Sequence, residues 1–215
     1  MTPRSLKNEF NQSPTDEEMG SFVGAAYDGD VITVVAFLKK YPESMDALTY
    51  FSGRNRRSYV DTTALIEAAA GGRKDIVELL LKNGAAIDKN TQHDWTALSA
   101  AIRNGHIDIV RLLLDNGADI DGRHPRGWTP LMEAISYRHL DIVKFLLGKG
   151  ASINKKYGSD FGPGKTALEI AEGNNIHLAS DKSMDAARQI EALLVKAEIE
   201  KHLNRKPSNI YKPKL

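Results

Sequence analysis

The sequence of 215 residues contains no cysteine. Disulfide bonds, thiolate metal sites and cysteine nucleophiles are therefore excluded, because each of them needs a thiol. A protein that uses no disulfides fits a reducing compartment, so we expect a cytoplasmic protein. Secretion by a non-classical route, as an effector, is the alternative that this composition leaves open.

Long apolar runs are also missing. No stretch approaches the roughly 20 apolar residues that a membrane helix needs. The N-terminal segment MTPRSLKNEFNQSP lacks the apolar core of a signal peptide. The sequence therefore predicts neither a membrane span nor a secretory leader, while its 41% of hydrophobic residues suffice for the core of one domain.

Neither sign of charge is in excess. The chain has 29 Lys and Arg against 28 Asp and Glu, a net charge of +1. Such a balance gives no overall attraction to nucleic acid or to a membrane surface. Two local basic stretches remain, SGRNRRSY and the tail from Lys201 to Leu215. Nucleic-acid tethering through these patches is an alternative that the overall charge disfavours.

What the sequence does contain is an internal repeat. Segments that start at residues 63, 96 and 129, and thus 33 residues apart, align without a gap: TALIEAAAGGRKDIVELLLKNGAAID, TALSAAIRNGHIDIVRLLLDNGADID and TPLMEAISYRHLDIVKFLLGKGASIN. A further start, Thr166-Ala167-Leu168, follows them. Self-similarity at such a period is the signature of a repeat architecture.

Each repeat predicts two helices, because its apolar residues recur at three- and four-residue spacing. A threonine N-cap opens the first helix and a left-handed glycine stops it. An aspartate occupies the first turn of the second helix, and another glycine ends that helix. The residues in register are Thr63, Thr96 and Thr129, then Gly72 and Gly105, then Asp75, Asp108 and Asp141, and finally Gly84, Gly117 and Gly150.

One helix pair cannot bury both of its faces, so the repeats are expected to stack and to need more polar units at the ends. Upstream, TDEEM predicts a capping box with Thr15 as N-cap and Glu18 reaching back to it. A second helix follows in VITVVAFLKK. Downstream, Met184 to Leu203 predicts a long closing helix that is charged on its outer side.

The unit resembles the ankyrin repeat, whose T-P-L-H-x-A, glycine and LLL-x-x-G-A-x-x-N landmarks are matched from Asp61 to Asn154 and more loosely to Ala171. The resemblance implies an all-α solenoid of about five stacked helix-turn-helix units with protruding β-hairpin turns. Its expected organisation is a flexible segment 1–14, a repeat domain 15–203 and a disordered basic tail 204–215. The expected repeats are 15–60, 61–93, 94–126, 127–163 and 164–203.

The sequence departs from this pattern at a few places. Arg138 stands where the other internal repeats have glycine, so it must adopt a left-handed conformation at a cost of about 1 kcal/mol or end the helix differently. It is either an arginine displayed beside Tyr137 or a tolerated substitution. The hairpins at 41–61 and 155–165 exceed the period and are candidate loops for a partner, with neutral drift as the alternative. The insertion at 174–183 has no interpretable pattern.

No catalytic, metal or cofactor constellation is predicted, and we expect no enzyme. GPGKT, from Gly162 to Thr166, resembles a phosphate loop. However, Ser159 stands where the spacing of such a loop requires its first glycine, and no buried strand precedes the segment. The six histidines do not form a ligand set. Glu67 and Glu133 repeat on first helices and are interpreted as half-buried polar residues. The alternative is a nucleotide-dependent or enzymatic role around Gly162–Thr166.

The resemblance further implies that partners bind at the hairpin tips and on the inner face of the first helices. The matching positions carry Trp, Tyr and basic residues. Trp, Tyr and Arg are the residue types that dominate interface hot spots. These candidate partner-binding residues are Tyr59, Trp95, Arg103, Arg126, Trp128, Tyr137 and Lys165. Each tryptophan could instead pack on the next unit, and both roles can coexist.

The predicted function is therefore that of a non-enzymatic scaffold for protein–protein interaction. The basic residues among the candidates favour a partner protein with an acidic segment. We expect a monomer, no membrane span and no nucleic-acid ligand.

Overall fold

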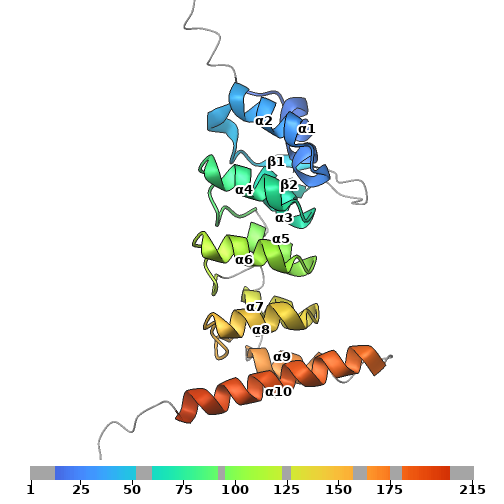
Figure 1. The fold of residues 1–215 in the computed structure, drawn as a ribbon, viewed down its shortest axis with the longest axis vertical. Coiled ribbons are helices and arrows are strands. Elements are labelled where there is room, and N and C mark those ends of the chain that lie inside the picture. Colours follow the sequence, from blue (N-terminus) through green and yellow to red (C-terminus); the bar gives the residue numbers. More distant parts are fainter. Residues whose placement is uncertain are drawn as a thin grey trace, which may run out of the picture. The chain divides into compact units, whose positions relative to one another are not determined.

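The computed structural model describes residues 13–51, 60–91, 95–122, 127–156, 164–174 and 181–203. The chain divides into two compact units, Met1–Pro130 and Leu131–Leu215. In the described ranges both units consist mainly of helices that follow one another in pairs joined by short turns (Figure 1). No helix in these ranges is long and apolar enough to cross a membrane.

The described residues of the first unit form three helix pairs. They are α1 (Asp16–Asp28) with α2 (Val31–Lys40), α3 (Ala64–Ala70) with α4 (Lys74–Lys82), and α5 (Ala97–Arg103) with α6 (Ile107–Asp115). The first helices pack on one another, so that α3 lies between α1 and α5 (Figure 1). The helix-turn-helix stacking expected from the repeat is thus observed here.

The long segment at 41–61 also has regular structure. A 3-10 turn, η1 (Pro42–Ser44), leads to β1 (Thr49–Phe51), which pairs antiparallel with β2 (Val60–Thr62). The Cα of Thr49 lies opposite that of Thr62 in this register. The basic stretch between the two strands lies outside the described residues. The expected β-hairpin is therefore observed as its pair of strands.

Small residues permit the close approach of α3 to α1. Ala64, Ala68 and Ala69 are fully buried. A Cβ atom added at Gly71 would collide with the carbonyl oxygen of Tyr27 at the end of α1. The alanine-rich first helix is thus a packing requirement, because side chains larger than a methyl group would separate the stacked helices.

In the first unit, hydrogen bonds between an aspartate carboxylate and a backbone N–H connect the loops of successive repeats. Asp46 accepts a hydrogen bond from the backbone N–H of Ala86 at 3.0 Å. One repeat further on, Asp88 accepts from the N–H of Asp119 at 3.3 Å. Each contact satisfies a backbone donor of the following repeat, and it fixes the position of the loop that carries the carboxylate.

The predicted N-caps at Thr15, Thr63 and Thr96 are confirmed. Thr63 and Thr96 accept hydrogen bonds from the backbone N–H groups of Ile66 and Ser99, which lie in the first turns of α3 and α5. The capping box at Thr15 is also present, since the Glu18 carboxylate accepts the Thr15 N–H at 2.9 Å. These short-range interactions define where the helices begin.

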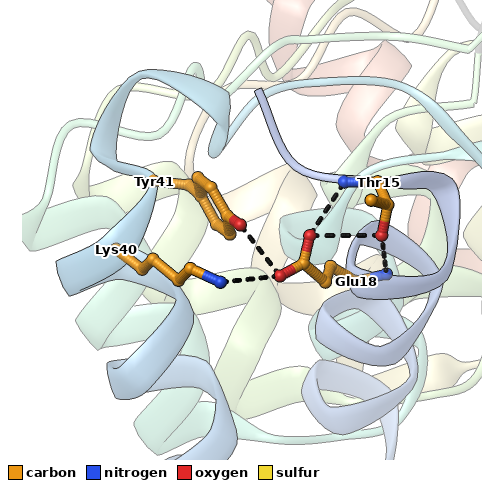
Figure 2. Close-up of polar contacts among 4 residues, drawn as sticks. All are labelled: Thr15, Glu18, Lys40 and Tyr41. Carbon is orange, nitrogen blue, oxygen red and sulfur yellow. Dashed lines mark hydrogen bonds and ion pairs between the residues drawn. The ribbon is translucent and has the colours of Figure 1, made fainter. Parts of the chain in front are cut away.

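Glu18 does more than cap α1, as Figure 2 shows. Its other carboxylate oxygen accepts hydrogen bonds from Lys40 Nζ and from the Tyr41 hydroxyl, both at 2.8 Å. These contacts join the start of α1 to the end of α2. The hydrogen bond from Lys40 is the main reason why the pKa of Glu18 falls to about 2.

The second unit holds α8 (Leu140–Gly148), α9 (Ala167–Asn174), α10 (Asp181–Leu203) and all but the first residue of α7 (Pro130–Ser136). The long helix α10 packs against α8 and α9. Arg138, in the turn between α7 and α8, has φ +60°, so the first of the two alternatives, a left-handed residue, is the one observed.

Two expectations from the sequence need correction. The closing helix begins at Asp181 rather than at Met184, and its outer side is not wholly charged. Val195, Ile199 and Leu203 are exposed on it, because only one side of this long helix packs inward. The other correction concerns Glu67 and Glu133, which are fully buried rather than half-buried.

A buried carboxyl group needs hydrogen bonds to offset its lost hydration. Glu67 accepts a hydrogen bond from the hydroxyl of Thr62 at 3.1 Å. Thr62 lies in β2 and is itself buried. The hairpin strand therefore supplies one of the polar contacts that offset the burial of this side chain.

Candidate partner-binding surface

Trp95 lies two residues before the start of α5. Its backbone N–H donates to the hydroxyl of Thr91 at 3.1 Å, and its carbonyl accepts from the N–H of Thr91 at 3.1 Å. Thr91 is buried and Thr96, the next residue, caps α5. The half-buried indole is thus attached to a backbone that is fixed on both sides.

Arg103, the last residue of α5, approaches this indole. Its guanidinium carbon lies 4.9 Å from the centroid of the Trp95 ring. Helical side chains lean toward the N-terminus of their helix, which is the direction in which Trp95 lies. A cation over an aromatic face gains about 0.5–1 kcal/mol at an exposed site. The structure thus brings two of the predicted residues together, and we name them the Trp95–Arg103 pair.

Trp128, the second tryptophan, lies directly before the buried Thr129 at the end of the first unit. Its side chain is half-buried. Trp128 lies two residues before the start of α7 (Pro130–Ser136). Partial burial is compatible with a packing role, a binding role or both.

In the second unit, Tyr137 and Lys165 are both exposed. Tyr137 is 41% exposed and its ring is stacked with that of His139, with centroids 6.3 Å apart. Lys165 immediately precedes Thr166, which caps α9. Both residues are accessible to a partner.

The remaining two candidates, Tyr59 and Arg126, lie outside the described residues. The same is true of the Arg54 to Arg57 cluster and of Gly162 within GPGKT. These parts of the predicted surface remain predictions from the sequence.

The described part of GPGKT contacts a carboxylate at the start of α9. Glu169 accepts a hydrogen bond from the backbone N–H of Thr166 at 2.6 Å, while Thr166 caps the N–H of Glu169. The backbone hydrogen bond from Thr166 lowers the pKa of Glu169. A carboxylate therefore already occupies the position at which a helix N-terminus would bind an anion.

One feature of the first unit was missed by sequence reasoning. A cleft of about 220 Å³ lies among two loops and the starts of two first helices. Its lining residues are Asp88, Asn90, Thr96, Leu98, Ser99, Asp119, Gly122 and Pro130. We call it the interloop cleft. The 33-residue register gave no signal for this pair, because Asp88 aligns with Asp121 and Asp119 aligns with Ala86.

Within the described ranges, no group of three or more His, Asp or Glu residues is arranged to hold a metal ion. The arrangement of aromatic, basic and acidic side chains on a rigid backbone is suited to recognition of another molecule by shape and charge.

Comparison with known proteins supports this interpretation. The family model for ankyrin repeats, described as three copies, matches residues 23–124, 65–157 and 119–190. These matches together span most of the chain, which therefore belongs to the ankyrin-repeat family. No curated protein matches the sequence. Ankyrin repeats generally mediate protein–protein interactions, and they are typically non-enzymatic modules.

Proposed function

We propose that this chain is a non-enzymatic scaffold that binds a partner protein through the inner faces of its first helices and its hairpin junctions. The single observation that carries the proposal is the Trp95–Arg103 pair, with 4.9 Å between guanidinium carbon and ring centroid. Tryptophan and arginine are the residue types most enriched among interface hot spots. Here both are attached to a fixed backbone, which lowers the entropy lost on binding.

The chemistry of the pair favours an acidic segment on the partner. The Arg103 guanidinium lies over the Trp95 ring, and the edge of a guanidinium plane binds carboxylates in a bidentate manner. Lys165 adds an exposed positive charge in the second unit. Trp128 and Tyr137 are further contact residues under this proposal. A monomer is expected, which light scattering of the purified chain tests directly.

The experiment is affinity capture from an extract of the source cells with the full chain as bait. The double variant Trp95→Ala/Arg103→Ala is expected to bind the captured protein at least about tenfold more weakly, because a hot-spot truncation typically costs 2 kcal/mol or more. Arg111→Ala is the matched control, since it removes an exposed arginine from the second helix α6 instead.

Three results would count against the proposal. The captured protein is retained equally by the double variant, or it is lost equally from Arg111→Ala. The third is capture of nucleic acid with an affinity that falls steeply with salt, which would point to binding of phosphates.

A further inference from the structure

The interloop cleft combines an apolar floor with two carboxylates. Leu98 and Pro130 are buried and line the cleft. Asp88 and Asp119 are exposed and line it too, together with the hydroxyl-bearing residues Thr96 and Ser99. Its volume of about 220 Å³ is below the roughly 300–1,000 Å³ typical of small-molecule pockets. The cleft therefore suits a single side chain better than a cofactor.

Both carboxylates are held in place by backbone hydrogen bonds. Asp88 accepts from the N–H of Asp119 at 3.3 Å, and Asp119 accepts from the N–H of Asp121 at 2.9 Å. Fixed carboxylates lose little conformational entropy when a cation binds to them. The negative charge of the cleft is thus preorganised.

In the described part of the chain, no Lys, Arg or His forms an ion pair with Asp88 or Asp119. The hydroxyl of the buried Ser99 is paired with that of Thr96 at 3.2 Å, so the acceptors of the cleft are chiefly the two carboxylates. The cleft therefore presents acceptor groups and negative charge that the described residues do not neutralise.

We infer that the interloop cleft binds an arginine side chain of the partner protein. The aliphatic part of such a side chain packs on the floor of Leu98 and Pro130, because arginine buries its methylene groups along apolar surfaces. The planar guanidinium, with five N–H donors, serves both carboxylates at once, which a lysine ammonium does less well. This inference rests on the proposed function, since it assigns a second anchor to the same partner.

The two sites have opposite charge preferences. The Trp95–Arg103 pair favours an acidic residue, whereas the cleft favours a basic one. A partner segment with both charges is recognised in one orientation only, because the reversed segment places like charges together.

The test uses the full chain labelled with ¹⁵N and the probe N-acetyl-arginine amide. The amide resonances of Asp88, Ser99 and Asp119 are expected to shift with a Kd of about 1 mM, a weak affinity suited to one side chain. N-acetyl-citrulline amide, which has nearly the same shape without the charge, is expected to cause no such shifts. Equal shifts with both compounds would show that the charge is not recognised.

The variant for this test is Asp88→Asn/Asp119→Asn. Each asparagine keeps a carbonyl oxygen for the backbone N–H that the carboxylate accepts, so the loops are expected to stay in place. Loss of the charged hydrogen bonds should weaken binding of the arginine compound at least about tenfold. The matched control is Asp108→Asn, which removes a charge from α6 outside the cleft.

Failure here can be told apart from failure of the proposed function. If capture of the partner depends on the Trp95–Arg103 pair but is unchanged by Asp88→Asn/Asp119→Asn, the cleft inference is wrong and the proposed function stands. If the variant binds N-acetyl-arginine amide as tightly as the natural sequence does, the inference is likewise overturned. If the arginine compound binds only in the cleft, but the Trp95→Ala/Arg103→Ala variant captures the partner as well as the natural sequence does, the proposed function is the part that fails.

Discussion

Two turns that join the first helix of a repeat to its second follow the same path with different residues. In the first unit Gly105 has φ +75°, and in the second unit Arg138 has φ +60°. Glycine adopts this left-handed conformation at no steric cost, whereas a residue with a Cβ pays about 1–2 kcal/mol for it.

The backbone hydrogen bonds of the two turns are the same. The N–H of Gly105 donates to the residue three positions earlier at 3.0 Å, and that of Arg138 does so at 3.1 Å. The following histidine donates to the residue five positions before it in both turns, at 2.9 and 3.0 Å. These bonds satisfy the last carbonyls of the first helix, so they impose the left-handed residue. The left-handed conformation at this position is therefore determined by the hydrogen bonds of the repeat and not by the presence of glycine.

The largest expected effect comes from Gly72→Ala, in the turn that precedes the one at Gly105. Gly72 has φ +73°, and a Cβ there would lie 2.8 Å from the imidazole of His106. The strain of about 1–2 kcal/mol and the overpacking of about 1–3 kcal/mol together predict a loss of about 2–5 kcal/mol in the free energy of unfolding. Urea denaturation of the full chain measures it.

Gly84→Ala separates the two contributions. Gly84 has φ +91°, but a Cβ there would meet no atom within 4 Å. Only the left-handed strain should then remain, at about 1–2 kcal/mol. Equal losses for the two variants would show that contact with His106 is unimportant.

The next effect, of opposite sign, is expected from Arg138→Gly. Glycine relieves the strain but gains conformational entropy in the unfolded chain, so the net stabilisation should be about 0.5–1 kcal/mol. Thermal unfolding monitored by circular dichroism would show a higher midpoint. Arg138→Ala keeps the strain and should not stabilise; if both variants destabilise equally, contacts of the arginine side chain outweigh its backbone strain.

The smallest effect concerns the α1/α2 pair. A short turn joins these helices at one end, and the hydrogen bonds of Glu18 with Lys40 and Tyr41 join them at the other. The pKa of Glu18 is lowered from 4.5 to about 2, chiefly by the hydrogen bond from Lys40. The native state therefore favours the charged carboxylate. Its stabilisation is complete above pH 4.5 and is lost as the pH falls toward 2.

Glu18→Gln is therefore expected to be less stable than the natural sequence at pH 7 and nearly equal to it at pH 2. Urea midpoints across this pH range measure the difference. The effect should be modest, because the contacts are near the surface and salt screens them. Glu17→Gln, also in the first turn of α1, is the control. A difference independent of pH would contradict the assigned role of the charge.

Much of the fold could be predicted from the sequence because the relevant interactions are local. Thr15, Thr63 and Thr96 cap helices whose first turns they reach within three residues. The glycines in register mark where helices end, since few other residues tolerate a left-handed backbone. The apolar spacing then indicates which helix faces are buried.

The candidate site was predictable only in part. Trp95 and Arg103 were assigned to one face by the repeat, but their approach to 4.9 Å depends on the path of a long side chain. The interloop cleft was missed because Asp88 and Asp119 are 31 residues apart. The burial of Glu67 was misjudged, since its hydrogen bond comes from Thr62 in the hairpin strand β2.

The sequence alone is enough to give the repeat, the starts of α1, α3 and α5, and the family to which the chain belongs. Helix periodicity, caps and turns depend on neighbours within a few residues, so they are written directly into the order of amino acids. Only the folding of distant segments against one another buries Glu67 and brings Asp88 and Asp119 to one cleft. Those outcomes depend on contacts between distant segments, whose geometry is fixed only when the repeats stack.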